Sequence, residues 1–174
     1  MKRRLRVSLV LQFVLAAYFQ LILWFRLGAW NDQPGKRLGE LAREGQAALA
    51  FGFAILMVLP LMLFILAFWK RWTWLMWLGA AGYGVWALLQ IQSWWVPWFF
   101  GADQRALSNA KALKRTFKIF PVSPGHPAPD AMHFVLDLLL FAVLGTLAIG
   151  LFLTSRKTVT TSKQTRALTD RPSS

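Results

Sequence analysis

The chain has 174 residues, of which 56% are hydrophobic and 16% are charged, whereas soluble domains carry roughly 25% charged residues. Its formal net charge is +13, and the basic residues stand in short runs beside long apolar blocks. This arrangement predicts a lipid bilayer with anionic headgroups as the partner, and no nucleic acid. The sequence has no cysteine, which excludes disulfides, thiol catalysis and thiolate metal sites.

Four apolar segments are long enough to cross a bilayer as helices, which takes about 20 residues. The predicted spans are residues 7–30, 47–69, 72–93 and 131–153. Because lipid leaves no backbone group unpaired, four separate segments of this length must be helices. We therefore expect an all-α membrane protein, with residues 1–153 forming a four-transmembrane-helix bundle.

The first span follows a basic run, Lys2-Arg3-Arg4-Leu5-Arg6. A basic run before an apolar segment also begins a secretion signal, but the apolar core of a signal has only about 7–15 residues. Here the apolar stretch from Val7 to Phe25 is longer and has no clear cleavage site after it. We expect an uncleaved first span.

Prolines mark the second and third spans. Pro60 stands in the middle of the second span and predicts a kink there. Pro97 lies late in the third apolar run, so we expect that span to end near Gln92 or Ser93. The aromatic residues that follow would then lie at the membrane–water interface, where amphipathic rings are favoured: Trp94, Trp95, Trp98 and Phe99.

The distribution of Lys and Arg predicts the orientation. Four basic residues precede the first span, and only Lys70-Arg71 joins the second span to the third. Both features are typical of the cytoplasmic side. We therefore expect a multi-pass protein of a cell (cytoplasmic, or inner) membrane with both termini in the cytoplasm. Residues 154–174 are mostly Ser, Thr and basic residues and predict a disordered basic tail.

The second outer loop contains a basic amphipathic stretch, residues 102–119. Apolar residues recur in it at helical spacing, at Leu107, Ala110, Leu113 and Phe117. The basic residues among them are Arg105, Lys111, Lys114, Arg115 and Lys118. This pattern predicts an amphipathic interfacial helix, and its basic side chains are candidates for binding lipid headgroups. Residues 120–129 contain four prolines and cannot be helical.

Asp130, His133 and Asp137 fall on one helical face at the start of the fourth span. Asp130 follows a proline turn, where its carboxylate would cap the helix. Asp137 lies one to two turns inside the membrane. There an ionised group costs up to roughly 2.5–3.5 kcal/mol, so we expect a polar partner for it. The candidate partners are His133, Arg26, Gln90 and Gln92.

Two interpretations of this cluster stay open. The cluster either fixes helix packing, or it relays protons or binds a divalent metal with His126 as a further ligand. Two histidines without cysteine or HExxH spacing are not specific for a metal. We predict no cofactor.

The sequence contains no nucleophile elbow, no Gly-rich phosphate loop and no carboxylate pair with catalytic spacing. The leading hypothesis is therefore a non-enzymatic structural or accessory membrane component that works through an outer-face polar cluster, as a homo-oligomer or with a membrane protein partner. One alternative is a small oligomeric transporter or proton-coupled carrier that uses His133 and Asp137. Another is a membrane enzyme that acts on lipid headgroups at the outer leaflet, with His133 as general base.

Overall fold

The computed structural model describes residues 2–32, 37–70 and 72–169, with side chains for all of these except residues 2–4, 57, 109, 112 and 153–169. This part of the chain is all-helical, at 78% helix and without strands. The helices are α1 (Lys2–Trp24), α2 (Leu38–Arg43), α3 (Ala47–Lys70), α4 (Thr73–Gln90), α5 (Val96–Phe100), α6 (Gln104–Ala112) and α7 (Ala131–Thr169). A 3-10 turn, η1 (Gly28–Trp30), follows α1, and a π-helical turn, η2 (Ile91–Trp95), joins α4 to α5.

Three helical segments are long and apolar enough to cross a membrane. They are Leu5–Trp24, Thr73–Phe100 and Ala131–Phe152. α3 adds a fourth if its two halves, Ala47–Leu56 and Val58–Lys70, which are bent by 48°, are counted as one span. The predicted kink is present, because Pro60 has no N–H to donate along the helix and its ring crowds the preceding turn.

Gln20 of α1 contacts the bend in α3. Its Nε2 donates to the Ala54 carbonyl oxygen at 3.0 Å, and its Oε1 accepts from Trp24 Nε1 at 2.9 Å. Backbone carbonyls near a proline kink need partners from neighbouring helices when they lie in lipid. The Gln20 amide supplies such a donor and ties α1 to α3.

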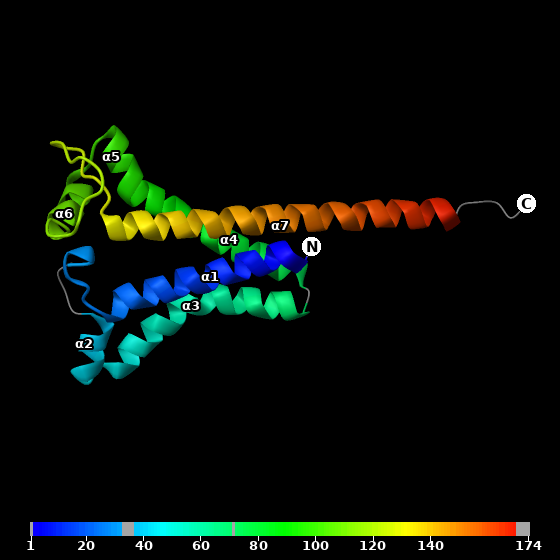
Figure 1. The fold of residues 1–174 in the computed structure, drawn as a ribbon, viewed down its shortest axis with the longest axis horizontal. Helices are drawn as coiled ribbons and strands as arrows, with labels where there is room; N and C mark the ends of the chain where they lie inside the picture. Colours follow the sequence, from blue (N-terminus) through cyan, green and yellow to red (C-terminus); the bar gives the residue numbers. More distant parts are fainter. Residues whose placement is uncertain (1, 33–36, 71, 170–174) are drawn as a thin grey trace, which may run out of the picture.

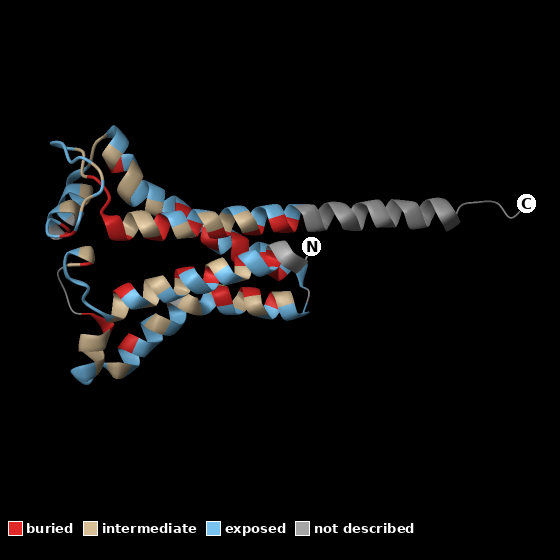
Figure 2. Ribbon diagram, viewed as in Figure 1, coloured by how far each residue is buried: buried red, intermediate tan, exposed pale blue. Residues whose placement is uncertain are grey.

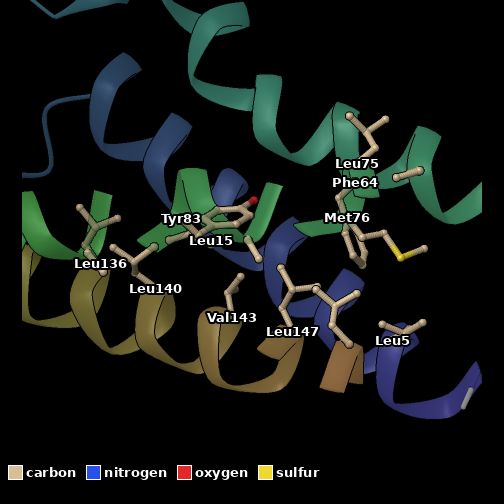
Figure 3. Close-up of a cluster of buried hydrophobic side chains, with 14 residues drawn as sticks. Leu5, Leu15, Phe64, Leu75, Met76, Tyr83, Leu136, Leu140, Val143 and Leu147 are labelled. Carbon is tan, nitrogen blue, oxygen red and sulfur yellow. The ribbon is translucent and has the colours of Figure 1, made fainter. Parts of the chain in front are cut away.

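The core lies where α1, α3, α4 and α7 meet (Figure 1, Figure 3). Buried apolar side chains from all four helices form one cluster, including Leu15, Phe64, Tyr83 and Leu140. Figure 2 shows exposed residues along each long helix beside the buried ones. Many of the exposed residues are large and apolar, such as Trp69 at 80% exposure. An apolar outer surface of this extent suits lipid contact.

α1 ends at Trp24, before the predicted end near residue 30. The Asn31 amide closes the helix. Its Oδ1 accepts from Leu27 N at 2.7 Å, and its Nδ2 donates to the carbonyl oxygens of Ile22 at 3.0 Å and Phe25 at 2.8 Å. Asn31 is fully buried, so these bonds satisfy carbonyls that the helix end would otherwise leave without partners.

The helix of the third predicted span continues past residue 93, through η2 and α5 to Phe100. In η2 the Val96 N–H donates to the Ile91 carbonyl oxygen, which shifts the hydrogen-bond ladder by one residue. Pro97 then stands in the first turn of α5, where a helix tolerates a residue that has no N–H. The π turn therefore lets the span pass the proline.

α7 continues beyond the predicted end of the fourth span near residue 153. Its backbone is helical to Thr169 and extends past the other helices (Figure 1). This differs from the disordered tail expected from residue 154. No Gly or Pro occurs between Gly150 and Pro172, so nothing in the sequence breaks the helix there. Residues 170–174 lie outside the described residues.

Candidate functional site

The loops that carry the candidate residues gather at one end of the bundle, opposite the N-terminus and the α3–α4 junction (Figure 1). We call this end, formed by residues 25–32, 37–46 and 101–130, the loop end. Backbone bonds join its two loops: Phe117 N donates to the Ala29 carbonyl oxygen, and Ala131 N to the Phe117 carbonyl oxygen, both at 2.8 Å. Lys118 and Asp130 pair as an isolated antiparallel bridge. The loop after α6 is thereby fixed against both η1 and the start of α7.

Tyr18 of α1 links η1 to the start of α7 through its hydroxyl. Its Oη donates to the Met132 carbonyl oxygen at 3.0 Å and accepts from Trp30 Nε1 at 3.1 Å. One side chain of α1 therefore holds both η1 and the first turn of α7. Hydrogen bonds therefore join α1, η1, the loop after α6 and the start of α7 at the loop end.

Asp130 is fully buried at the start of α7. Its Oδ1 accepts from the His133 backbone N–H at 2.9 Å, which is the bond of an N-cap, and from His133 Nδ1 at 2.7 Å. Burial raises the pKa of Asp130, but the hydrogen bonds and charge of His133 outweigh it, so that the pKa of this carboxyl lies below its usual value. Asp130 is therefore the anionic partner of His133.

His133 is nearly covered, with a side chain that is 12% exposed. Its ring lies against Trp94, with 4.0 Å between the ring centroids and 37° between the planes. Because Nδ1 faces the Asp130 carboxylate, Nδ1 carries the proton of the neutral ring and Nε2 is the nitrogen that accepts one.

Asp137 lies one turn further along α7 and is 1% exposed. Its Oδ2 accepts from Trp95 Nε1 at 2.7 Å. Gln90 at the end of α4 lies within electrostatic reach of the same carboxyl. Its direct donor is thus a tryptophan that the sequence had suggested as part of an interfacial belt, because we expected the third span to end before it.

Arg26 does not join this cluster. Its Nε donates to Glu40 Oε1 at 2.6 Å, and its Nη1 lies 4.0 Å from Asp32 Oδ1. The hydrogen bond from Arg26 is the main reason that the pKa of Glu40 falls to about 2. Because α1 ends early, Arg26, one of the candidate partners of Asp137, faces α2 and bonds to Glu40.

His126 also lies apart from His133. Its Nδ1 donates to the Trp98 carbonyl oxygen at 3.0 Å, in a turn where Ala102 N donates to the Gly125 carbonyl oxygen at 2.8 Å. Over residues 2–32, 37–70 and 72–169, no three His, Cys, Asp or Glu side chains are placed to hold a metal ion. The structure thus assembles Asp130, His133 and Asp137 along α7 without His126.

The basic residues after α5 divide into two groups. Arg105, Lys111, Lys114 and Arg115 are exposed, the first two on α6 and the others in the turn after it. Lys118 is half-buried, and its Nζ donates to Thr116 Oγ1 at 3.2 Å. α6 itself spans Gln104–Ala112, a shorter helix than the stretch predicted over residues 102–119.

An aromatic cluster surrounds Trp95, the residue that donates to Asp137. Phe120 of the Pro-rich loop packs against Trp98 and Phe134, with centroid distances of 4.9 and 5.4 Å, and lies 5.8 Å from Trp95. The sequence could not place Phe120 here, because an irregular loop has no periodicity that shows which side chains turn inward.

No protein-family model, no curated protein and no solved structure matches the chain. The function proposed below therefore depends on the geometry of the chain itself.

Proposed function

We propose that the chain is a four-span integral protein of a cytoplasmic membrane, with both termini in the cytoplasm, and that it serves as a non-enzymatic structural or accessory component. The three apolar segments and the bent α3 support the count of four. The basic N-terminal run and Lys70 lie at one end of the bundle, which supports a cytoplasmic position for that end (Figure 1). The loop end then faces outward, and a second copy or another membrane protein is its expected partner.

The hydrogen bonds within the polar cluster support the non-enzymatic role, because its three residues bond to neighbouring parts of the protein. Asp130 caps α7 and holds His133, while Asp137 holds Trp95 of η2. The ring of His133 packs on Trp94. These bonds join α7 to the π turn of the third span and leave His133 little access to a substrate, which favours a role in fixing the loop end.

Reporter insertions test the four crossings. A reporter enzyme that is active only outside the cytoplasm should work when inserted after Glu44 or after Asp103, and should fail when fused to the C-terminus. If α3 does not cross the membrane, the insertions after Glu44 and Asp103 must report opposite sides. Activity at the C-terminal fusion contradicts the proposed orientation.

Complementation of a deletion strain separates an accessory role from catalysis. We expect His133→Ala to restore the impaired phenotype as well as the parent protein does, because the cap bond to the His133 backbone N–H remains. Gly150→Leu should fail, since even a Cβ at Gly150 would lie 3.0 Å from Leu5 Cδ2 in the contact of α7 with α1. Loss of complementation by His133→Ala at normal protein level would contradict the accessory role and favour a function that uses His133, either the proton-coupled carrier or the lipid-headgroup enzyme.

Anionic headgroups are the lipid partner that the loop end suits. Four exposed basic residues, Arg105, Lys111, Lys114 and Arg115, lie close in sequence to exposed apolar side chains such as Phe100, at 83% exposure, and Phe117. Apolar side chains that enter the bilayer surface beside cations suit an anionic interface.

Replacing these four basic residues with Gln should abolish a preference for anionic over zwitterionic phospholipid. Each basic residue near such a surface contributes roughly 1 kcal/mol at low salt. The measurement is native mass spectrometry of lipids retained from a mixture of phosphatidylglycerol and phosphatidylcholine. The matched single variant Lys118→Gln should change little, since Lys118 is already bonded to Thr116. An unchanged preference in the fourfold variant rules out this surface.

A further inference from the structure

Two buried carboxylates of the cluster each have one oxygen without a hydrogen-bond partner. These oxygens are Oδ2 of Asp130 and Oδ1 of Asp137. Asp130 has the His133 side chain beside it. Within the residues that the structure describes, the donors near Asp137 are neutral, the Trp95 indole at 2.7 Å and the Gln90 amide, although Asp137 lies inside the membrane-spanning part of α7. An ionised Asp137 would therefore lie inside the membrane-spanning part of α7 with neutral hydrogen-bond donors beside it.

The groups that face Asp137 do not neutralise it. From α7 the titratable neighbours are His133, which is already bonded to Asp130, and Asp130, which is itself acidic. From α4 and η2 the neighbours are the neutral Gln90 and Trp95. Within the described part of the chain, no Lys or Arg forms an ion pair with Asp137. An isolated carboxylate at such a position is expensive, and taking up a proton removes that cost.

We propose that Asp137 is a proton-binding site and that the His133–Asp130 pair is the group through which its proton exchanges with the loop end. The proton resides on Oδ1, while Oδ2 continues to accept from Trp95. On release, the Oδ1–H bond breaks and its electron pair stays on the carboxylate. Because Oδ1 has no direct hydrogen-bond partner, the proton passes through a bridging water to form a new bond at His133 Nε2. The resulting imidazolium is stabilised by Asp130 until it gives a proton to water at the loop end.

The surroundings favour a proton over a metal ion. Trp95 contacts the rings of Phe120 and Phe134, so that the side chains around its indole are aromatic and supply no oxygen ligands. Calcium and magnesium take six or more oxygen ligands. A protonated carboxyl needs only one acceptor for its O–H, and the neighbouring Gln90 amide has an acceptor oxygen as well as the donor that favours the ionised form. A proton-binding role goes beyond the accessory function proposed above and does not depend on it.

Infrared spectroscopy of the full chain in detergent micelles tests the proposal directly. At neutral pH the parent protein should show the carbonyl stretch of a protonated carboxylic acid, and Asp137→Asn should lack it. Asn has the shape of the neutral acid and keeps an acceptor for Trp95, so this variant should fold. The matched control Asp103→Asn, at an exposed residue whose Oδ1 caps Ala106, should retain the band.

Absence of the band at neutral pH, or its persistence in Asp137→Asn, overturns the proton site. If Asp137→Asn fails to fold, labelling the parent protein with ¹³C-aspartate decides the matter, because the band must shift when an aspartate carries the proton. The relay is tested by transfer into D₂O. His133→Gln should keep the band but slow its hydrogen–deuterium exchange at least several-fold, and an unchanged rate rules out His133 as the exchanging group.

Discussion

Asn31→Ala should destabilise the folded protein by about 3 kcal/mol, since a buried polar group left without a partner costs about 1–3 kcal/mol. The substitution removes the acceptor for Leu27 N and the donor to the Ile22 and Phe25 carbonyl oxygens, all in the turn that ends α1. The bond from Arg37 Nη2 to the backbone carbonyl oxygen of residue 31 remains in the variant, so the loss is confined to the three bonds of the side-chain amide. The measurement is the free energy of unfolding in mixed detergent, followed by circular dichroism.

Two further variants serve as controls for this result: Asn31→Asp removes only the amide donor, and Gln104→Ala truncates an exposed side chain. Asp keeps the acceptor for Leu27 N but places a carboxylate against two carbonyl oxygens, so its stability should fall further as pH rises and the carboxylate ionises. Gln104 is exposed at the first residue of α6, and its truncation should be nearly neutral. If Asn31→Ala is as stable as Gln104→Ala, the amide does not hold the end of α1.

The long apolar segments were predictable from the sequence because bilayer thickness sets a length that composition alone reveals. The kink at Pro60 was predictable for a similarly local reason, since proline removes a helical donor wherever it stands. The π turn η2 was not predictable in this way. It depends on how Ile91–Trp95 and Pro97 fit together in the third span, and the apolar pattern there is the same with or without the extra residue in the turn.

The candidate site was predicted along one helix but not across helices. Asp130, His133 and Asp137 share a face because helical spacing requires it. Trp95 was missed as the donor to Asp137 because η2 changes the path of the third apolar helix. Arg26, a candidate partner, bonds to Glu40 because α1 ends at Trp24. Both differences concern where a helix turns or stops, which contacts from residues outside the helix, such as those of Asn31, decide.

Which basic residues of the second outer loop are exposed could not be predicted from the sequence either. The amphipathic pattern treated Lys118 as equivalent to Arg115, but a residue's partner in an irregular loop depends on how the loop folds back. Lys118 pairs with Asp130 through the backbone, and its side chain turns to Thr116, whereas Arg115 stays exposed. Helical periodicity ends with α6 at Ala112. Beyond that residue the sequence pattern no longer predicts which side chains are buried and which are exposed.

Asp130→Ala should destabilise the protein by about 2–3 kcal/mol at neutral pH. Loss of an N-cap costs about 1 kcal/mol, and a hydrogen bond to a charged group adds about 1.5–3 kcal/mol, less the cost of burying Asp130 Oδ2 without a partner. Asp130→Asn should lose less, because its side-chain oxygen still accepts from the His133 backbone N–H. The free energy of unfolding in mixed detergent measures both variants.

The pH dependence identifies the charge on Asp130. Because the pKa of Asp130 is lower in the folded protein than its usual value of 3.8, its ionised form stabilises the fold above that value. This contribution is lost as pH falls below 3.8 through the folded pKa, since the unfolded chain then binds the proton more readily. The parent protein should therefore lose stability in acid more steeply than Asp130→Asn, which has no proton to bind there. Equal slopes for the two proteins would show that Asp130 is not an anion held by His133, and the cap alone would then account for its place at the start of α7.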